Sequence, residues 1–94
     1  MKTENMTSTN GNKVANQFII TDDNGNTFFQ SYSSIIVKIN SGDGNYYVEL
    51  DQKYWNYSNT TGKYRNIFLN ETIKDTRKKI KSGEYKLTDL NGGI

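Results

Sequence analysis

The sequence has 94 residues and contains no cysteine, no histidine and no proline. The length predicts one domain, and the composition excludes disulfides, thiolate nucleophiles, imidazole bases and the usual zinc ligands. No apolar run approaches the roughly 20 residues of a membrane helix, and the N-terminal segment lacks the apolar stretch of a secretory signal, so we expect a cytoplasmic protein with no membrane partner.

Residue usage indicates the kind of genome that encodes the chain, and the distribution of charge indicates a charged partner. Asparagine, lysine, isoleucine and tyrosine are abundant, whereas alanine occurs once and arginine twice. This preference for residues with A/T-rich codons indicates a low-GC bacterium, or a phage or plasmid living in one. The net charge of +2 is distributed unevenly, because residues 1–52 carry three lysines against six acids and residues 53–86 carry nine cations against three acids. Such asymmetry indicates a charged partner.

The first half of the chain predicts an antiparallel sheet. Residues 1–12 are polar and lack hydrophobic periodicity, so we expect a flexible N-terminal arm. Beyond it, apolar and polar side chains alternate, as is typical of half-buried strands. Asn24-Gly25 predicts a type I′ hairpin turn, and Gly42 and Gly44 predict a second turn. The predicted strands, three or four of which form a meander, lie at residues 14–21, 27–32, 35–40 and 46–51.

The same alternation assigns a face to each side chain of the last two predicted strands. Ile35, Val37 and Ile39 are expected to share one face. In the following strand the expected inward residues are Tyr46, Val48 and Leu50, and the expected outward residues are Tyr47, Glu49 and Asp51.

The second half of the chain predicts two helices, because the apolar period changes to about 3.6. Ser58 or Asn59 is a suitable N-cap for the first helix, whose apolar stripe consists of Tyr57, Thr61, Tyr64, Ile67 and Phe68. Asn70 can cap the second helix, which is expected to turn Ile73, Arg77 and Ile80 inward and to end at Gly83.

A short edge strand is expected through Tyr85 and Leu87, and residues 91–94 are expected to fray. The prediction is therefore an α+β protein, with a three- to four-stranded antiparallel meander followed by two helices packed on one face. Residues 13–90 form its single domain.

Two stretches invite a catalytic interpretation. Thr60-Thr61-Gly62-Lys63 lacks the earlier glycine and the following Ser/Thr of a phosphate-binding loop. Asp43, Asp51 and Lys53 echo a nuclease arrangement in which two carboxylates hold Mg²⁺ and a lysine steadies the attacking water. The helical frame of such nucleases is missing, so a Mg²⁺ nuclease is the third hypothesis. We expect no catalytic residue, no metal and no cofactor.

Two surfaces are candidates for binding. Seven tyrosines and one tryptophan exceed what so small a core can hold, and these residue types are enriched at protein interfaces. The predicted partner-binding residues are Tyr47, Glu49, Asp51, Tyr54, Trp55, Tyr57, Lys63 and Arg65. The alternative is nucleic-acid binding by the second helix, through Lys74, Arg77, Lys78, Lys79 and Lys81.

A stretch near the middle of the chain carries a family resemblance. Tyr57, Ser58, Thr60, Thr61 and Lys63 fit an aromatic-Ser-x-Thr-Thr-x-Lys/His motif, which is followed by the apolar pair Phe68-Leu69. Over roughly residues 28–91 the sequence resembles a family of small proteins without assigned activity that phages and plasmids of low-GC bacteria encode. The resemblance implies a mobile-element origin, and small proteins of that kind often inhibit host defences, CRISPR nucleases included.

The leading hypothesis is a non-enzymatic accessory protein of a phage or mobile element that binds and inhibits a host macromolecule. Its sharpest form is an anti-CRISPR-like inhibitor of a host defence protein. The alternative is a small basic DNA- or RNA-binding regulator. The sequence leaves monomer and homodimer both open.

Overall fold

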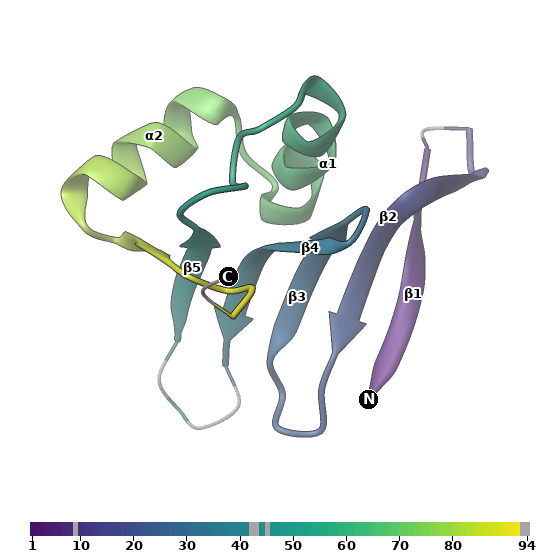
Figure 1. Ribbon diagram of the computed structural model, residues 1–94, viewed down its shortest axis with the longest axis horizontal. Helices are drawn as coiled ribbons and strands as arrows, with labels where there is room; N and C mark the ends of the chain where they lie inside the picture. The colour runs from purple at the N-terminus through teal and green to yellow at the C-terminus, as the bar shows by residue number, and fades with distance from the viewer. Residues whose placement is uncertain (9, 42–43, 45, 93–94) are drawn as a thin grey trace.

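The computed structural model describes residues 1–8, 10–41, 44 and 46–92, which form six strands and two helices (Figure 1). No helix in these residues is long and apolar enough to cross a membrane. The elements are β1 (Lys2–Thr7), β2 (Lys13–Thr21), β3 (Thr27–Ser31), β4 (Ser34–Asn40), β5 (Tyr47–Asp51), α1 (Asn59–Leu69), α2 (Ile73–Ser82) and β6 (Tyr85–Thr88).

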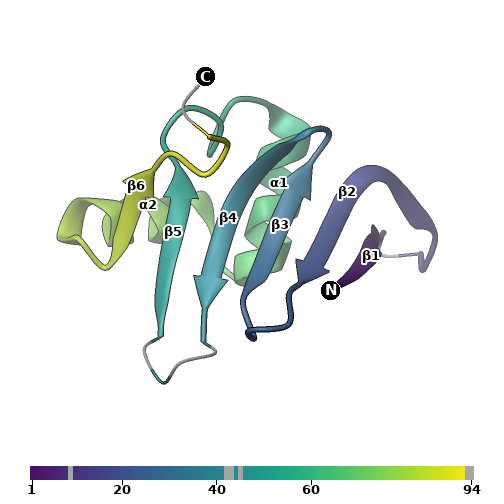
Figure 2. The same ribbon diagram turned by 60° about the horizontal axis from the view of Figure 1, so that its bottom comes forward.

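All six strands form one sheet in the order β1-β2-β3-β4-β5-β6. Strands β1 to β5 are an antiparallel meander, and β6 pairs in parallel with β5 because α1 and α2 carry the chain back across the sheet. Both helices lie on the same side of the sheet, which leaves its other face open (Figure 2). The predicted α+β class is confirmed, but the sheet is larger than the expected three- to four-stranded antiparallel meander and is partly parallel.

The additional N-terminal strand comes from the segment that we expected to be a flexible arm. Residues 2–7 pair with β2, and Met6 is the one buried side chain of β1. Main-chain hydrogen bonds to β2 order this strand. It therefore forms without the alternation of apolar and polar side chains by which strands are predicted. Part of the expected C-terminal fraying, at residues 93–94, lies outside the described residues.

Two face assignments were wrong for local reasons. A β-bulge opposite Phe29 and Gln30 shifts the register of β4, so Val37 is paired with Phe29 whereas Ile35 is paired with Gln30 on the other face. Tyr46 precedes β5 and is exposed rather than inward.

The hairpin at Asn24-Gly25 is confirmed, but its turn is not type I′. Among the described residues of this turn only Gly25 has a positive φ, at 84°, whereas a type I′ turn needs two such residues. The Asp22 carboxylate accepts hydrogen bonds from the backbone N–H groups of Asn24 and Asn26, at 2.9 Å each, and this stabilises a longer loop. The second predicted turn includes residues 42, 43 and 45, which lie outside the described part of the chain.

Helix α1 begins as predicted, whereas α2 begins later than predicted. Ser58 is the N-cap of α1 and accepts a hydrogen bond from the Thr61 backbone N–H. Asn70 adopts the left-handed conformation that ends α1, and α2 is capped by Thr72 in a capping box with Asp75. Gly83 ends α2, as expected.

The core lies between the helices and the sheet. Phe29 of β3 stacks on Phe68 of α1, with ring centroids 5.7 Å apart. The remaining buried apolar side chains are Met6, Ile36, Val37, Val48, Leu50, Tyr64 and Tyr85.

A polar cluster holds α2 on β6. The Glu71 carboxylate accepts hydrogen bonds from Lys79 Nζ and Tyr85 Oη, at 2.8 Å each, and from Thr76 Oγ1. Burial acts to raise the pKa of Glu71, but these hydrogen bonds outweigh it and hold the pKa below its ordinary value. The cluster therefore favours a charged carboxylate that links α2, through Thr76 and Lys79, to Tyr85 of β6.

Candidate functional site

Arg65 is the least expected feature of α1, because only 1 % of its surface is exposed. Its Nη1 donates to the Trp55 carbonyl at 2.8 Å and to Asn56 Oδ1 at 3.0 Å, and its Nη2 donates to Asn66 Oδ1 at 3.0 Å. The guanidinium also lies 5.4 Å from the centre of the Trp55 ring. These contacts join the loop after β5 to the helix.

All hydrogen-bond acceptors found for this buried cation are neutral. No ion pair in the described residues involves Arg65, and its Nε is buried without a hydrogen-bond partner. Burial lowers the pKa of Arg65, the nearby charge of Arg77 lowers it further, and Glu71 only partly opposes this. Buried charges are usually paired, so the guanidinium is a site of uncompensated positive charge.

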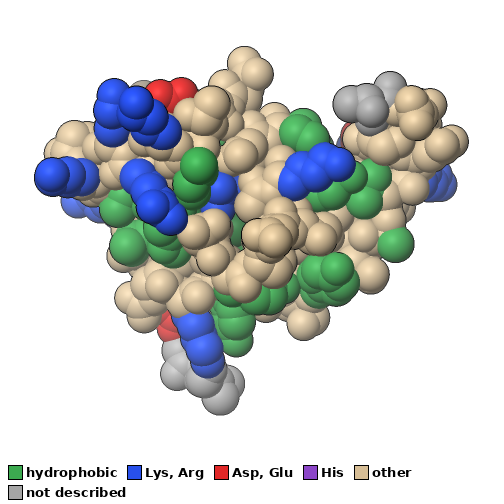
Figure 3. Space-filling model, turned by 90° about the horizontal axis from the view of Figure 1, so that it is seen from above, with side chains coloured by type: hydrophobic (Ala, Val, Ile, Leu, Met, Phe, Trp, Pro, Cys, Tyr) green, Lys and Arg blue, Asp and Glu red, His purple; other side chains and the backbone are tan. Residues whose placement is uncertain are grey.

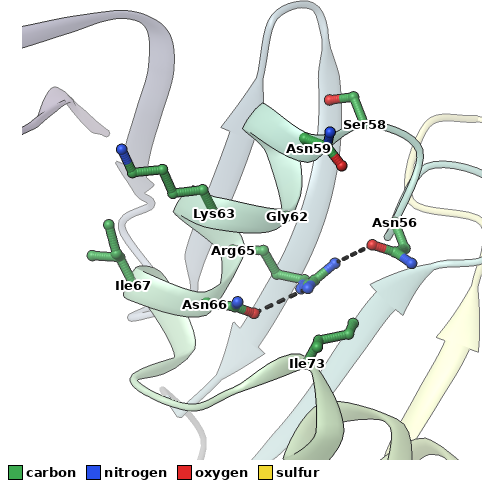
Figure 4. Close-up of a pocket in the computed structure, with 9 residues that line it drawn as sticks. All are labelled: Asn56, Ser58, Asn59, Gly62, Lys63, Arg65, Asn66, Ile67 and Ile73. Atoms are coloured by element: carbon green, nitrogen blue, oxygen red, sulfur yellow. Dashed lines mark hydrogen bonds between the residues drawn. The ribbon is translucent and has the colours of Figure 1, made fainter.

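A pocket of about 550 Å³ opens beside this guanidinium (Figure 4). In Figure 4 the Arg65 side chain extends between Asn56 and Asn66, whereas the Lys63 side chain points away from it. The lining of the pocket holds two cations, Lys63 and Arg65, and no carboxylate. The lining residues are Asn56, Ser58, Asn59, Gly62, Lys63, Arg65, Asn66, Ile67 and Ile73.

Gly62 keeps the pocket open at the guanidinium. A Cβ at this position would lie 3.6 Å from Arg65 Nη2 and 3.6 Å from Asn56 Oδ1. Glycine inside a helix costs up to about 1 kcal/mol relative to alanine. The residue therefore weakens α1 at a position beside the buried cation, where it adds no side chain to the pocket.

The outward side of α1 continues from the pocket. Asn59, Lys63 and Ile67 are exposed and spaced four residues apart, so they lie along one face of the helix. Ile67 is 50 % exposed and Tyr57, just before the N-cap, is 46 % exposed. We call these four residues, together with the Arg65 pocket, the α1 surface.

Three of the predicted partner-binding residues are buried or half-buried. Asp51 is only 1 % exposed, and its carboxylate accepts hydrogen bonds from the backbone N–H groups of Lys53, Tyr54 and Leu90. It was predicted to face outward because it continues the alternation of β5, but here the strand ends and the side chain orders the following loop. Tyr54 and Trp55 are half-buried against the core.

Two more of the predicted residues lie on the open face of the sheet. Tyr47 is 41 % exposed, and Glu49 pairs with Lys38 across the strands at 4.0 Å. In the register of the sheet, Glu49 is opposite Lys38 and Lys86, on the side away from Val48 and the helices. The eight predicted residues therefore do not form one surface. Tyr47 and Glu49 lie on the open sheet face, whereas Tyr54 packs edge to face on Tyr57, with ring centroids 5.5 Å apart, and Trp55 packs on Arg65, beside α1.

The predicted basic residues of α2 form a clear stripe. Lys74, Arg77, Lys78 and Lys81 are exposed and have the spacing of one helix face, so the prediction that Arg77 faces inward was wrong. Figure 3 shows blue side chains gathered at the end of the molecule where α2 lies. Lys79 is separate from this stripe, because it is half-buried and bonded to Glu71.

The residues proposed for a nuclease are not assembled by the described structure. Asp43 lies outside the described residues, and Asp51 is occupied by backbone N–H groups. Within residues 1–8, 10–41, 44 and 46–92, no three acidic, histidine or cysteine side chains gather closely enough to hold a metal ion.

Sequence reasoning missed Asn56, Asn66 and Ile73 as pocket residues. Their positions depend on how the loop after β5 and the start of α2 fold back on α1, which no local pattern encodes. The one local signal was Gly62, a helix-weakening residue near the start of a helix.

The fold and the site together define a small α+β domain with a cationic pocket beside exposed aromatic and apolar side chains. The chain belongs to a family of unknown function, DUF8033, whose model matches residues 1–85. Neither a curated protein nor a solved structure matches the sequence.

Proposed function

We propose that this protein is a non-enzymatic accessory protein of a phage or another mobile element, and that it binds and inhibits a host macromolecule in the bacterial cytoplasm. The proposed target is a host defence protein, in the sharpest case a CRISPR nuclease. The codon-biased composition and the aromatic-Ser-x-Thr-Thr-x-Lys stretch support the mobile-element origin.

The α1 surface is the observation that carries the proposal. Tyr57 and Ile67 are large and exposed, and the Arg65 pocket lies within the same surface. Aromatic residues and arginine dominate binding energy at protein interfaces, where they occupy desolvated positions. A surface of this composition suits binding to another protein and needs no reacting group.

Affinity capture from a host lysate, with identification by mass spectrometry, tests the proposal. We expect one dominant host protein, whose recovery falls at least about tenfold with Ile67→Asp, because a charge would then be buried in the interface. Leu87→Asp, at an exposed position of β6, is the matched control and should retain the partner. If neither wild type nor control enriches any host protein, the proposal is wrong.

The basic stripe on α2 supports a second candidate function, a DNA- or RNA-binding regulator. Four exposed cations on one helix face are suited to contact phosphates. This candidate predicts an affinity for duplex DNA or RNA that falls steeply with salt. Changing Lys74, Arg77, Lys78 and Lys81 to Gln should remove it, whereas Lys63→Gln should reduce the salt dependence only slightly.

A further inference from the structure

We propose that the Arg65 pocket binds a side-chain carboxylate of the partner protein, so that α1 recognises an acidic segment. The inference rests on the proposed function for the class of partner, because it assumes that the occupant belongs to a protein. The chemistry of the pocket is measurable on the isolated chain.

The hydrogen bonds of Arg65 show where a carboxylate would bind. Nη1 uses both of its hydrogens, on the Trp55 carbonyl and Asn56 Oδ1. Nη2 has one bond, to Asn66 Oδ1, and Nε has none. Nε–H and one Nη2–H lie along the same edge of a guanidinium, and two parallel bonds at such an edge are the usual geometry of an Arg–carboxylate pair.

A carboxylate that displaces the Asn66 amide from Nη2 would reach Nε at the same time. It would exchange one neutral acceptor for two charged ones and give the orphan Nε–H a partner. Charge-assisted hydrogen bonds are about twice as strong as neutral ones, so this exchange favours the bound state. The incoming charge would also compensate a cation that the described residues leave without an ion pair.

The remainder of the pocket favours an acidic protein segment over a phosphate backbone. Ile67 and Ile73 line it beside the polar groups, and apolar walls fit the methylene groups of Asp or Glu and their neighbours better than a hydrated phosphodiester. The Lys63 ammonium points away from Arg65 (Figure 4), so it adds a rim charge rather than a second ligand.

Two single substitutions within α1 should change the affinity in opposite directions. Gly62→Ala would place a methyl group 3.6 Å from Nη2 and 3.8 Å from Nη1, so it narrows the pocket beside the guanidinium. Asn66→Ala would remove the competing acceptor and leave the edge of the guanidinium free. A merely electrostatic attraction would respond to neither, because neither changes the charge.

The test is an NMR titration that follows the Arg65 Nε–H resonance. The probe is an acetylated, amidated nonapeptide with three glutamates and two leucines, and its glutamine counterpart is the control. We expect the glutamate peptide to shift Arg65 Nε–H, the glutamine peptide to leave it in place, Gly62→Ala to weaken binding about tenfold, and Asn66→Ala to strengthen it. Backbone spectra of both variants verify that they are folded.

Several results would overturn the inference. One is an Arg65 Nε–H that does not move at saturating glutamate peptide, and another is a peptide affinity that neither variant changes. A single-stranded DNA that shifts this resonance when the peptide does not would show that the pocket takes phosphate.

The two proposals fail separately. If the peptide binds as expected but no host protein is captured, the pocket chemistry stands without the inhibitor function. If Gly62→Ala captures the host protein as well as wild type does, the inhibitor function stands without the carboxylate site.

Discussion

Gly62 and Arg65 lie one turn apart on α1, and the backbone of the first packs beside the buried guanidinium of the second. A Cβ on residue 62 would be in van der Waals contact with Arg65 Nη2, at 3.6 Å. The contact distance is ordinary, so alanine fits at this position without a clash. Glycine is therefore not needed here to relieve crowding.

Gly62→Ala should stabilise the protein by up to about 1 kcal/mol, because alanine is the better helix former. Urea unfolding with a shared m-value measures the change. The matched control is Gly83→Ala at the end of α2, where φ is 87° and a Cβ would meet no atom within 4 Å. There the same substitution should destabilise by about 1 kcal/mol, because alanine is strained in the left-handed conformation. If Gly62→Ala and Gly83→Ala change the free energy of unfolding in the same direction, the two glycines do not differ in this way.

Glu71 should make the protein sensitive to acid. Its pKa in the folded state lies below the ordinary value of 4.5. Its contribution to stability is therefore fully present above about pH 5 and is lost as the pH falls through the folded-state pKa. Glu71→Gln should reduce the free energy of unfolding by about 2 kcal/mol at pH 7.

Denaturant unfolding from pH 7 to pH 3 separates this charge effect from a general loss of stability. The difference between wild type and Glu71→Gln should shrink as the pH falls. Part of the acid sensitivity should remain in the variant, because Asp51 also has a lowered pKa. A difference that is constant over this pH range would show that the charge of Glu71 plays no part.

The fold could be predicted where its signals are local. The Ser58 cap, the Gly83 stop and the Asn24-Gly25 hairpin each depend on neighbouring residues, and the structure contains all three. Strand β1 could not be predicted, because its order comes from backbone pairing with β2 and not from the pattern of its own side chains. The burial of Arg65 also depends on another segment, since its acceptors include the loop that follows β5.

Gln17 is a second residue whose burial no pattern predicts. It is 0 % exposed, and both atoms of its side-chain amide lack a hydrogen-bond partner. Burying an unsatisfied amide costs about 1 to 3 kcal/mol, so Gln17→Met, which has a similar volume, should raise the free energy of unfolding by about that amount. Gln52→Met, at an exposed position, should change it by less than about 0.5 kcal/mol. A destabilised Gln17→Met variant would mean that this amide is hydrogen-bonded after all.

We propose that the chain inhibits by occupying a surface of its target, and an inhibition titration of the captured host enzyme tests this. The residual activity of a fixed enzyme concentration is measured against increasing amounts of this protein. We expect a linear fall to a breakpoint at a fixed small ratio of the two proteins, recovery of activity after dissociation, and loss of inhibition in Ile67→Asp. If a small fraction of an equivalent inactivates all of the enzyme, and inactivation continues with time, the protein turns over its target and does not act as a bound inhibitor.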